Sequence, residues 1–104
     1  MAEHVKVAQL AELEPGTTKV VDVQGRRIAL CHVRDGGVFA VDDVCTHDGA
    51  PLDQGDLDGH AIECPRHGAR FDVRTGAVIA LPAMVPIQTY DVHVDGDDVS
   101  VRVS

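Results

Sequence analysis

Two short motifs, each pairing one cysteine with one histidine, constrain this chain more than any other feature of its sequence. The first is Cys45-Thr46-His47, and the second, Cys64-Pro65-Arg66-His67, begins after sixteen intervening residues. In C-x-H the two side chains lie on the same side of an extended segment, and in C-x-x-H a turn brings them together, so each motif can form one metal-binding loop. Two such loops that face each other supply two thiolates and two imidazoles. Thiolates suit zinc or iron-sulfur centres and imidazole suits zinc, iron or copper, so this ligand set leaves the metal open.

The two motifs resemble the two-box signature of Rieske proteins, in which a 2Fe-2S cluster has two cysteines on one iron and two histidines on the other. The resemblance implies that Cys45 and Cys64 bind the inner iron, and that His47 and His67 bind the outer iron. It continues after each motif in the residues Gly49, Pro51, Leu52, Gly68, Phe71 and Asp72. A weaker match is Leu81-Pro82-Ala83, at the place where Rieske proteins carry a proline-containing loop over the cluster.

Two other uses of the cysteines compete with a Rieske cluster. A Cys45–Cys64 disulfide requires an exported protein, whereas the chain begins Met1-Ala2-Glu3-His4 without an apolar signal segment, which favours a reducing cytoplasm. A structural zinc site of two cysteines and two histidines is chemically sound, although zinc fingers usually place the two cysteines together and the two histidines together. We therefore expect one Rieske-type 2Fe-2S cluster as the cofactor.

Short apolar and β-branched runs, separated by turn signals every eight to twelve residues, predict an all-β fold. The runs cover residues 5–7, 20–23, 28–33, 38–41, 77–79, 87–94 and 99–103. Asp95-Gly96-Asp97 predicts a hairpin turn between the last two runs. Valines that alternate with polar residues predict one buried face on this hairpin. They are Val92, Val94, Val99, Val101 and Val103. Residues 9–14 can form one helical turn at most.

The segment from about residue 43 to residue 82 differs from the rest, because it has little periodicity and is rich in Gly, Pro and Asp. We interpret it as a cluster-binding subdomain inserted in a β base. The Rieske resemblance implies the same architecture, an antiparallel β-sandwich base with this insertion. A length of 104 residues corresponds to one domain, so we expect residues 1–104 to form a single Rieske domain.

Composition argues against two classes of partner. The chain is 44% hydrophobic but has no apolar run long enough to span a bilayer, so we do not expect a membrane subunit. Asp and Glu number 17 against nine Lys and Arg, and the formal net charge of −8 argues against nucleic acid as a partner. The acidity either steers the protein to basic patches on its partners or only maintains solubility, and both interpretations stay open.

The sequence contains too few histidines for a second iron site. Rieske oxygenases add a catalytic domain with a mononuclear iron held by two histidines and a carboxylate, and only His93 follows the second motif here. The chain therefore resembles a free-standing Rieske ferredoxin, an electron carrier without catalytic residues. The resemblance implies transient, electrostatic contacts with a flavin-dependent reductase and a terminal oxygenase of the aromatic-ring dioxygenase type, made by a cytoplasmic monomer. The alternatives are the small subunit of an assimilatory nitrite reductase and an accessory protein of iron-sulfur assembly or redox sensing.

Four positions near the motifs differ from the cytochrome bc type of Rieske protein. Ala50 and Arg66 stand where that branch has a disulfide between the cluster loops, and Ala69 and Phe71 stand where it has hydroxyl donors to sulfur. Because such donors stabilise the reduced cluster, their loss predicts a reduction potential near the lower end of the Rieske range, about −150 mV. Arg66 could pair with Asp48 across the loops in place of the disulfide.

The remaining cysteine and histidine side chains have no expected role in the metal site. Cys31 lies in a predicted strand, and we interpret it as a small buried side chain. The other histidines, which lack a cysteine at ligand spacing, are expected at the surface. They are His4, His32, His60 and His93.

Overall fold

The structure of the chain is a computed structural model, which describes residues 4–46, 49, 51–53, 55–65, 68–81 and 85–102. The elements in these residues are β1 (His4–Gln9), the 3-10 helix η1 (Leu10–Glu12), β2 (Thr17–Val23), β3 (Arg26–His32), β4 (Val38–Asp42), β5 (Leu57–Asp58), β6 (Ala61–Glu63), β7 (Arg70–Asp72), β8 (Val78–Ala80), β9 (Thr89–Asp95) and β10 (Asp98–Arg102). The all-β class is confirmed, and η1 is the single helical turn expected within residues 9–14. In this part of the chain no helix is long and apolar enough to cross a membrane.

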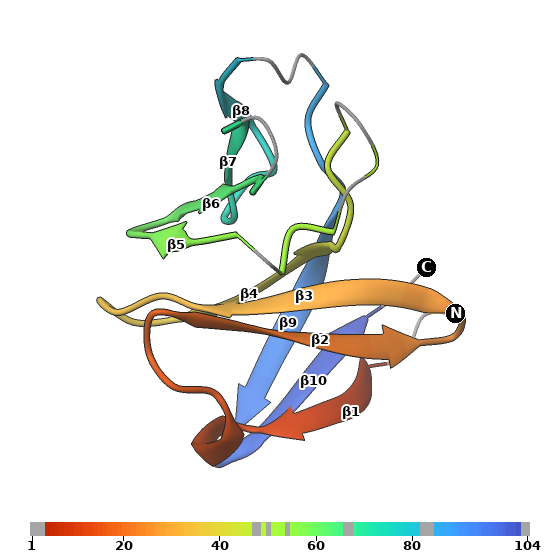
Figure 1. Cartoon of the computed structure of the whole chain (residues 1–104). Helices are drawn as coiled ribbons and strands as arrows, with labels where there is room; N and C mark the ends of the chain where they lie inside the picture. The colour runs from red at the N-terminus through yellow and green to blue at the C-terminus, as the bar shows by residue number, and fades with distance from the viewer. Residues whose placement is uncertain are drawn as a thin grey trace.

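Six antiparallel strands form the base of the molecule, in the order β1-β10-β9-β4-β3-β2 (Figure 1). β9 connects the two halves of this sheet, because it pairs with β10 over residues 91–95 but with β4 at Thr89 and Tyr90. The sheet folds over at β9, so that β1 and β10 enclose a core together with β3 and β4. We call this the base core. Its fully buried side chains include Ile28, Leu30, Val99 and Val101.

β3 is buried on both faces over residues 28–31, which explains the unbroken apolar run there. Ile28 and Leu30 belong to the base core, whereas Ala29 and Cys31 belong to a second core on the opposite face. Successive side chains of a strand alternate between the two faces of its sheet, so a strand between two cores needs an apolar residue at every position. β3 therefore contributes side chains to both cores and joins the base to the part of the chain that packs on its other face.

A smaller antiparallel sheet, in the order β5-β6-β7-β8, is inserted between β4 and β9 and stands above the base in Figure 1. The second core joins it to the base, since this core combines Phe71 and Ile62 of the insertion with Cys31 of β3. Phe71 is the largest fully buried side chain in the described residues. The β7–β8 turn is also tied to the segment before β9, because Ile87 donates its N–H to the Gly76 carbonyl at 3.0 Å. The insertion is thus packed firmly onto the base.

The C-terminal hairpin differs from the sequence prediction in two details. The strand predicted for residues 87–94 begins at Thr89, because Ile87 is buried in the second core instead. Val94 is 42% exposed although it lies opposite the fully buried Val99, so the predicted buried face stops before the hairpin turn. β4 pairs with β9 well before this point, which leaves the end of the hairpin less covered. Val103 lies outside the described residues.

Candidate metal centre

The two cysteines make the same backbone contact with a glycine four residues further on, and we call the two segments that these contacts close equivalent turns. The Cys45 carbonyl accepts a hydrogen bond from the N–H of Gly49 at 2.7 Å, and the Cys64 carbonyl accepts one from the N–H of Gly68 at 3.1 Å. Each turn ends on a glycine with a left-handed backbone, with φ of 78° at Gly49 and 76° at Gly68. Glycine adopts this conformation readily because it has no Cβ. The similarity of the two turns can be read from the sequence, because a glycine lies four residues after each cysteine. The spacing from cysteine to histidine does not show it, since it differs between the two motifs.

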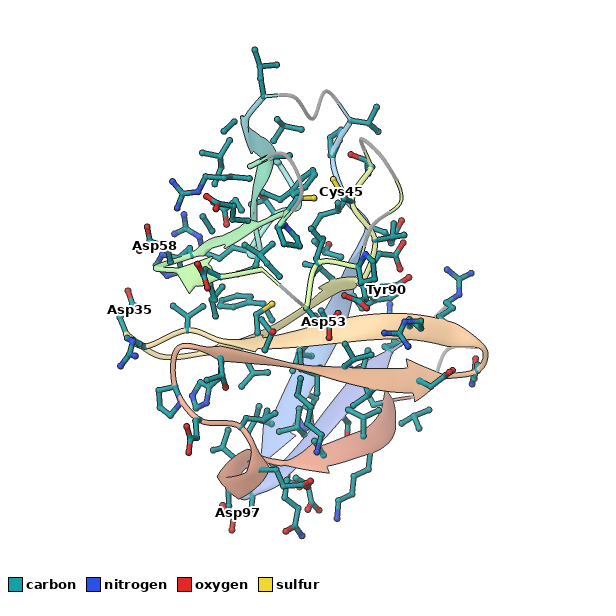
Figure 2. All side chains as sticks on the ribbon, viewed as in Figure 1. Asp35, Cys45, Asp53, Asp58, Tyr90 and Asp97 are labelled. Atoms are coloured by element: carbon teal, nitrogen blue, oxygen red, sulfur yellow. The ribbon has the colours of Figure 1, made fainter. Side chains whose placement is uncertain are left out.

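Different elements hold the two turns, and both place a cysteine in the interior. The Cys45 turn follows β4 of the base, whereas the Cys64 turn connects β6 to β7 of the insertion. The N–H of Cys64 also donates to the Ala69 carbonyl at 2.7 Å, which closes that hairpin. Cys45 is 1% exposed and Cys64 0%, and both belong to the second core. Figure 2 shows Cys45 on the loop above the base sheet. The fold therefore brings the two thiols into one buried region.

The other two expected ligands, His47 and His67, lie outside the described residues. The same holds for Asp48, Ala50, Arg66, Pro82 and Ala83. The histidine half of the site, the pairing of Asp48 with Arg66 and the proline loop therefore stay predictions. The disulfide alternative is different, because the structure describes all three cysteines and no disulfide joins any of them.

A buried carboxylate holds the segment that carries the first motif. The Asp43 side chain is 0% exposed, and its Oδ1 accepts hydrogen bonds from the N–H groups of Leu52 and Asp53 at 2.9 and 2.8 Å. Its Oδ2 accepts a hydrogen bond from Arg27 Nη2 at 3.0 Å. These contacts close the loop that contains Cys45. Sequence reasoning missed Asp43, whose one signal is its place two residues before a candidate ligand.

The surroundings of the two thiols fit an iron-sulfur cluster. Ala69 and Phe71 are both 0% exposed and lie in the second core with the two cysteines, so the positions that lack hydroxyl donors face the same interior. Two buried thiols on equivalent turns match the cysteine half of a Rieske ligand set. The apolar lining also keeps water away from that half of the site, which influences both the potential and the stability of a cluster.

Cys31 occupies the same core but has the properties of a packing residue. It is fully buried in β3, and its Sγ donates a weak hydrogen bond to the Ala29 carbonyl at 3.9 Å. Burial raises the pKa of the Cys31 thiol to about 12, and the negative charge of Asp43 adds to the shift. The thiol therefore stays protonated at neutral pH, whereas a metal ligand has to be a thiolate. This supports the interpretation of Cys31 as a small buried side chain.

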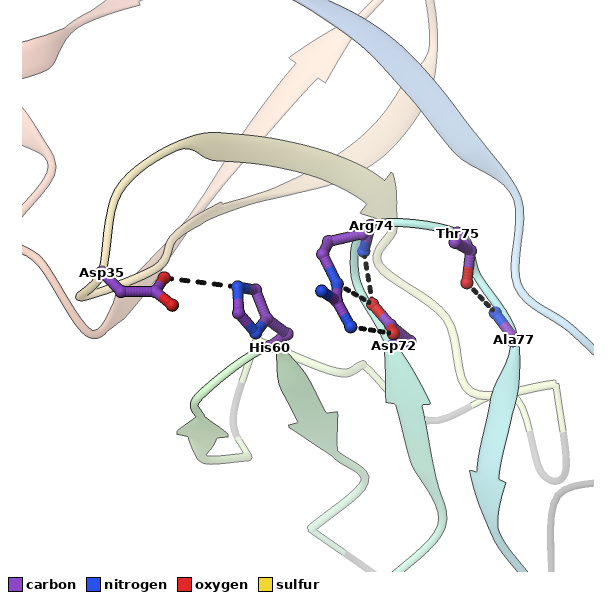
Figure 3. Close-up of polar contacts among 6 residues, drawn as sticks. All are labelled: Asp35, His60, Asp72, Arg74, Thr75 and Ala77. Atoms are coloured by element: carbon purple, nitrogen blue, oxygen red, sulfur yellow. Dashed lines mark hydrogen bonds and ion pairs between the residues drawn. The ribbon is translucent and has the colours of Figure 1, made fainter.

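A polar cluster at the side of the molecule connects the insertion to the base (Figure 3). His60, between β5 and β6, pairs with Asp35 of the β3–β4 turn, with 3.2 Å between Nε2 and Oδ1. Beside this pair, Arg74 donates hydrogen bonds to both carboxylate oxygens of Asp72, at 3.1 and 2.9 Å. The guanidinium holds the pKa of the Asp72 carboxyl below its usual value. The His60–Asp35 pair thus links two turns that are far apart in the sequence, whereas the Asp72–Arg74 contact lies within one turn.

The four histidines outside the motifs divide into two groups. His4 and His93 are exposed, as expected. His32 and His60 are half-buried, since His32 Nδ1 lies 2.7 Å from the Leu13 carbonyl oxygen and His60 makes the contact shown in Figure 3. These two rings are thus partly covered by a partner in space, which the prediction of surface positions did not include.

Exposed apolar side chains gather near the cysteine turns. Among the described residues, five large hydrophobic side chains are exposed, and four of them, with exposed fractions from 40% to 75%, lie directly after β4, in β8 or in the segments that follow β8. They are Val44, Ile79, Leu81 and Val85, and we refer to them as the apolar rim. Val44 directly precedes Cys45, and the Val85 carbonyl accepts a hydrogen bond from Thr46 Oγ1 at 2.6 Å. The rim therefore borders the first motif.

An antiparallel β-sandwich that buries two cysteines in one core is a small β protein with the cysteine half of the expected metal site in place. The family model described as the Rieske [2Fe-2S] domain matches residues 3–91, and the chain therefore belongs to this family. Its cofactor is accordingly the Rieske-type 2Fe-2S cluster that the two motifs led us to expect.

Similar proteins match nearly the whole chain. The ferredoxin component of the naphthalene 1,2-dioxygenase system of Pseudomonas aeruginosa is 38% identical over 100 residues, covering 96% of this chain and 95% of that protein. The solved ferredoxin of carbazole 1,9a-dioxygenase from Nocardioides aromaticivorans IC177 is 43% identical, with a TM-score of 0.90 and coverage of 94% and 95%. A solved complex of reduced oxygenase and oxidised ferredoxin in carbazole 1,9a-dioxygenase contains a chain 38% identical to this one, with a TM-score of 0.88 and coverage of 94% and 91%. The expected class, a dioxygenase-type ferredoxin that is not itself an enzyme, is confirmed by these matches.

Proposed function

We propose that this protein carries single electrons from a flavin-dependent reductase to the terminal oxygenase of a Rieske system that acts on aromatic rings. The observation that carries the proposal is the pair of buried cysteines on equivalent turns, in a chain that aligns over 94–96% of its length with ferredoxin components. Those relatives are named for naphthalene and carbazole dioxygenases, and one of them was solved together with an oxygenase. They favour this function over a nitrite reductase subunit or an accessory protein.

We propose Cys45 and Cys64 as ligands of the inner iron, and His47 and His67 as ligands of the outer iron. When bound, the cluster supplies a couple that takes up and releases one electron. The second core covers both cysteines, so the electron is expected to leave on the histidine side. The segment of about 43–82 would then be the cluster-binding subdomain of a single Rieske domain over residues 1–104.

The apolar rim is the surface that we propose meets both redox partners. Its four side chains carry no charge, so a partner can displace water from them at little cost. A contact of this small size suits a weak complex that separates after each transfer. Asp97, in the acidic turn between β9 and β10, lies at the other end of the molecule from Cys45 in Figure 2. The charge of this turn is therefore expected to act only at long range during the encounter, while the contact through the rim is apolar.

We also propose a monomer in a reducing cytoplasm. A carrier that meets two partners in turn through one face needs that face free, which favours a monomer.

Metal analysis and electron transfer together test the function. The purified protein is expected to be red-brown, to contain two iron and two acid-labile sulfide per chain, and to give a Rieske-type EPR signal after reduction. With a flavin-dependent reductase and a terminal oxygenase of an aromatic-ring dioxygenase system, it should be reduced by NADH and reoxidised when oxygenase and an aromatic substrate are added. A protein with one zinc contradicts the cofactor assignment. A loaded protein that reduces a nitrite reductase but no oxygenase contradicts the proposed partner.

A matched pair of variants tests the docking surface. Leu81→Asp places a charge on the rim and is expected to slow electron transfer at least tenfold without changing the iron content. Val94→Asp introduces the same charge at a side chain that is 42% exposed beside the β9–β10 turn, and should transfer electrons at the wild-type rate. Equal effects of the two variants would show that the rim is not the contact surface.

A further inference from the structure

We propose that Asp43 and Arg27 form a charge pair that positions the first cysteine turn and sets the reduction potential, with Asp43 lowering it and Arg27 raising it. The proposal rests on the assignment of Cys45 as a ligand, and it adds roles for two residues that are not ligands. Asp43 is the one buried charged side chain in the described part of the chain. The contacts of this buried carboxylate, which lies two residues before a proposed ligand, indicate its role.

The contacts of Asp43 explain how it positions the turn. The two N–H groups that donate to its Oδ1 belong to Leu52 and Asp53, at the far end of the loop that begins beside Cys45. The side chain of Leu52 is itself fully buried in the second core. On the other side, the carboxylate is bound by Arg27, and the Asp43 N–H donates to the Arg27 carbonyl at 3.0 Å. One carboxylate thus fastens both ends of the loop to the start of β3.

The two charges act on the potential with opposite signs. A negative charge near the site disfavours the gain of an electron, and a positive charge favours it. Asp43 is two residues from Cys45, so their Cα atoms lie within about 7 Å of each other. A unit charge about 10 Å away, at an effective dielectric constant of about 20, changes an equilibrium constant roughly tenfold. The Asp43 side chain is 0% exposed and that of Arg27 is 58% exposed, so solvent screens the effect of Arg27 more strongly.

The test compares Asp43→Asn and Arg27→Gln with two control variants. Asn keeps an oxygen that can accept from both backbone N–H groups but loses the acceptor of the Arg27 hydrogen bond, whereas Gln keeps an N–H that can donate to Oδ2, so Arg27→Gln is the cleaner removal of charge. The controls, Asp98→Asn and Lys6→Gln, remove the same charges from an ion pair between β1 and β10 in which both side chains are 53% exposed. Midpoint potentials are measured by voltammetry at one pH and ionic strength, together with iron content, sulfide content and the EPR spectrum.

Asp43→Asn is expected to raise the potential by a tenfold change in the reduction equilibrium constant, which is 59 mV for a one-electron couple. Arg27→Gln should lower the potential by a smaller amount, and the control variants should shift it less than either. Shifts of the same sign for the two variants overturn the proposal, because a purely structural role does not depend on the sign of the charge.

Two further outcomes are also decisive. If Asp43→Asn does not retain the cluster, the test depends on Arg27→Gln alone. The proposal is then overturned if the midpoint potential of Arg27→Gln is not lower than that of the control Lys6→Gln. A wild-type protein without iron, sulfide and the EPR signal contradicts the proposed function instead, so the two failures are distinguishable.

Discussion

Replacing Leu52 with alanine is expected to destabilise the protein strongly, while the same change at Leu81 has little effect. Leu52 is fully buried in the second core with both cysteines, whereas Leu81 is 75% exposed on the apolar rim. Truncating a buried leucine in this way costs about 2.7–5.0 kcal/mol, because the loss of burial is added to the cost of the cavity. An exposed substitution usually stays within about 0.5 kcal/mol. The expected difference exceeds about 2 kcal/mol, a large share of the roughly 5–15 kcal/mol that stabilises a domain.

Thermal unfolding of the cluster-loaded protein, followed by circular dichroism without oxygen, measures this difference. At about 4 °C or more per kcal/mol for a domain of this size, Leu52→Ala should lower the apparent midpoint by at least about 10 °C, and Leu81→Ala by only about 2–4 °C. The N–H of residue 52 that donates to Asp43 is unchanged, so the comparison isolates the side chain. The visible absorption of the cluster should bleach earlier in Leu52→Ala. Equal midpoints for the two variants would refute the view that the second core supports the site.

Three further predictions concern the ligands, the buried thiol and the turns. His47→Cys or His67→Cys should lower the potential or abolish the cluster, because a thiolate adds negative charge where neutral imidazole stood, and an unchanged voltammogram would show that these residues are not ligands. Folding raises the Cys31 pKa from 9.0 to about 12, so between these values the unfolded chain loses a proton that the folded chain keeps. The free energy of unfolding should therefore fall as pH rises, by up to about 1.4 kcal/mol per pH unit relative to Cys31→Ala. Urea unfolding of both proteins at several pH values measures this, and the same pH dependence in the two proteins would contradict the raised pKa. Gly49→Ala and Gly68→Ala should each cost about 1–2 kcal/mol in the free energy of unfolding, because both glycines have left-handed φ, and very unequal costs would argue against equivalent turns.

Most of the base strands could be predicted because their signals are local. The apolar runs 28–33 and 38–41 correspond to β3 and β4, and Asp95-Gly96-Asp97 lies at the β9–β10 turn as expected. The errors fall where a neighbour in space decides the outcome. Ile87 leaves the expected strand to fill the second core, and Val94 stays exposed where the adjacent strand has ended.

The type of cofactor could also be predicted, because cysteine and histidine spacing within two short turns is local information, and the family match agrees with it. The contacts that hold the two cysteine turns in place could not be predicted from the sequence. Arg27 and Asp43 are sixteen residues apart and meet because β3 and the end of β4 are neighbours in the base sheet. Likewise, the turns of Cys45 and Cys64 start from separate sheets and converge because β3 and the insertion bury one core between them. A buried carboxylate or thiol takes its partners from the segments that packing brings together, and no short stretch of sequence contains that information.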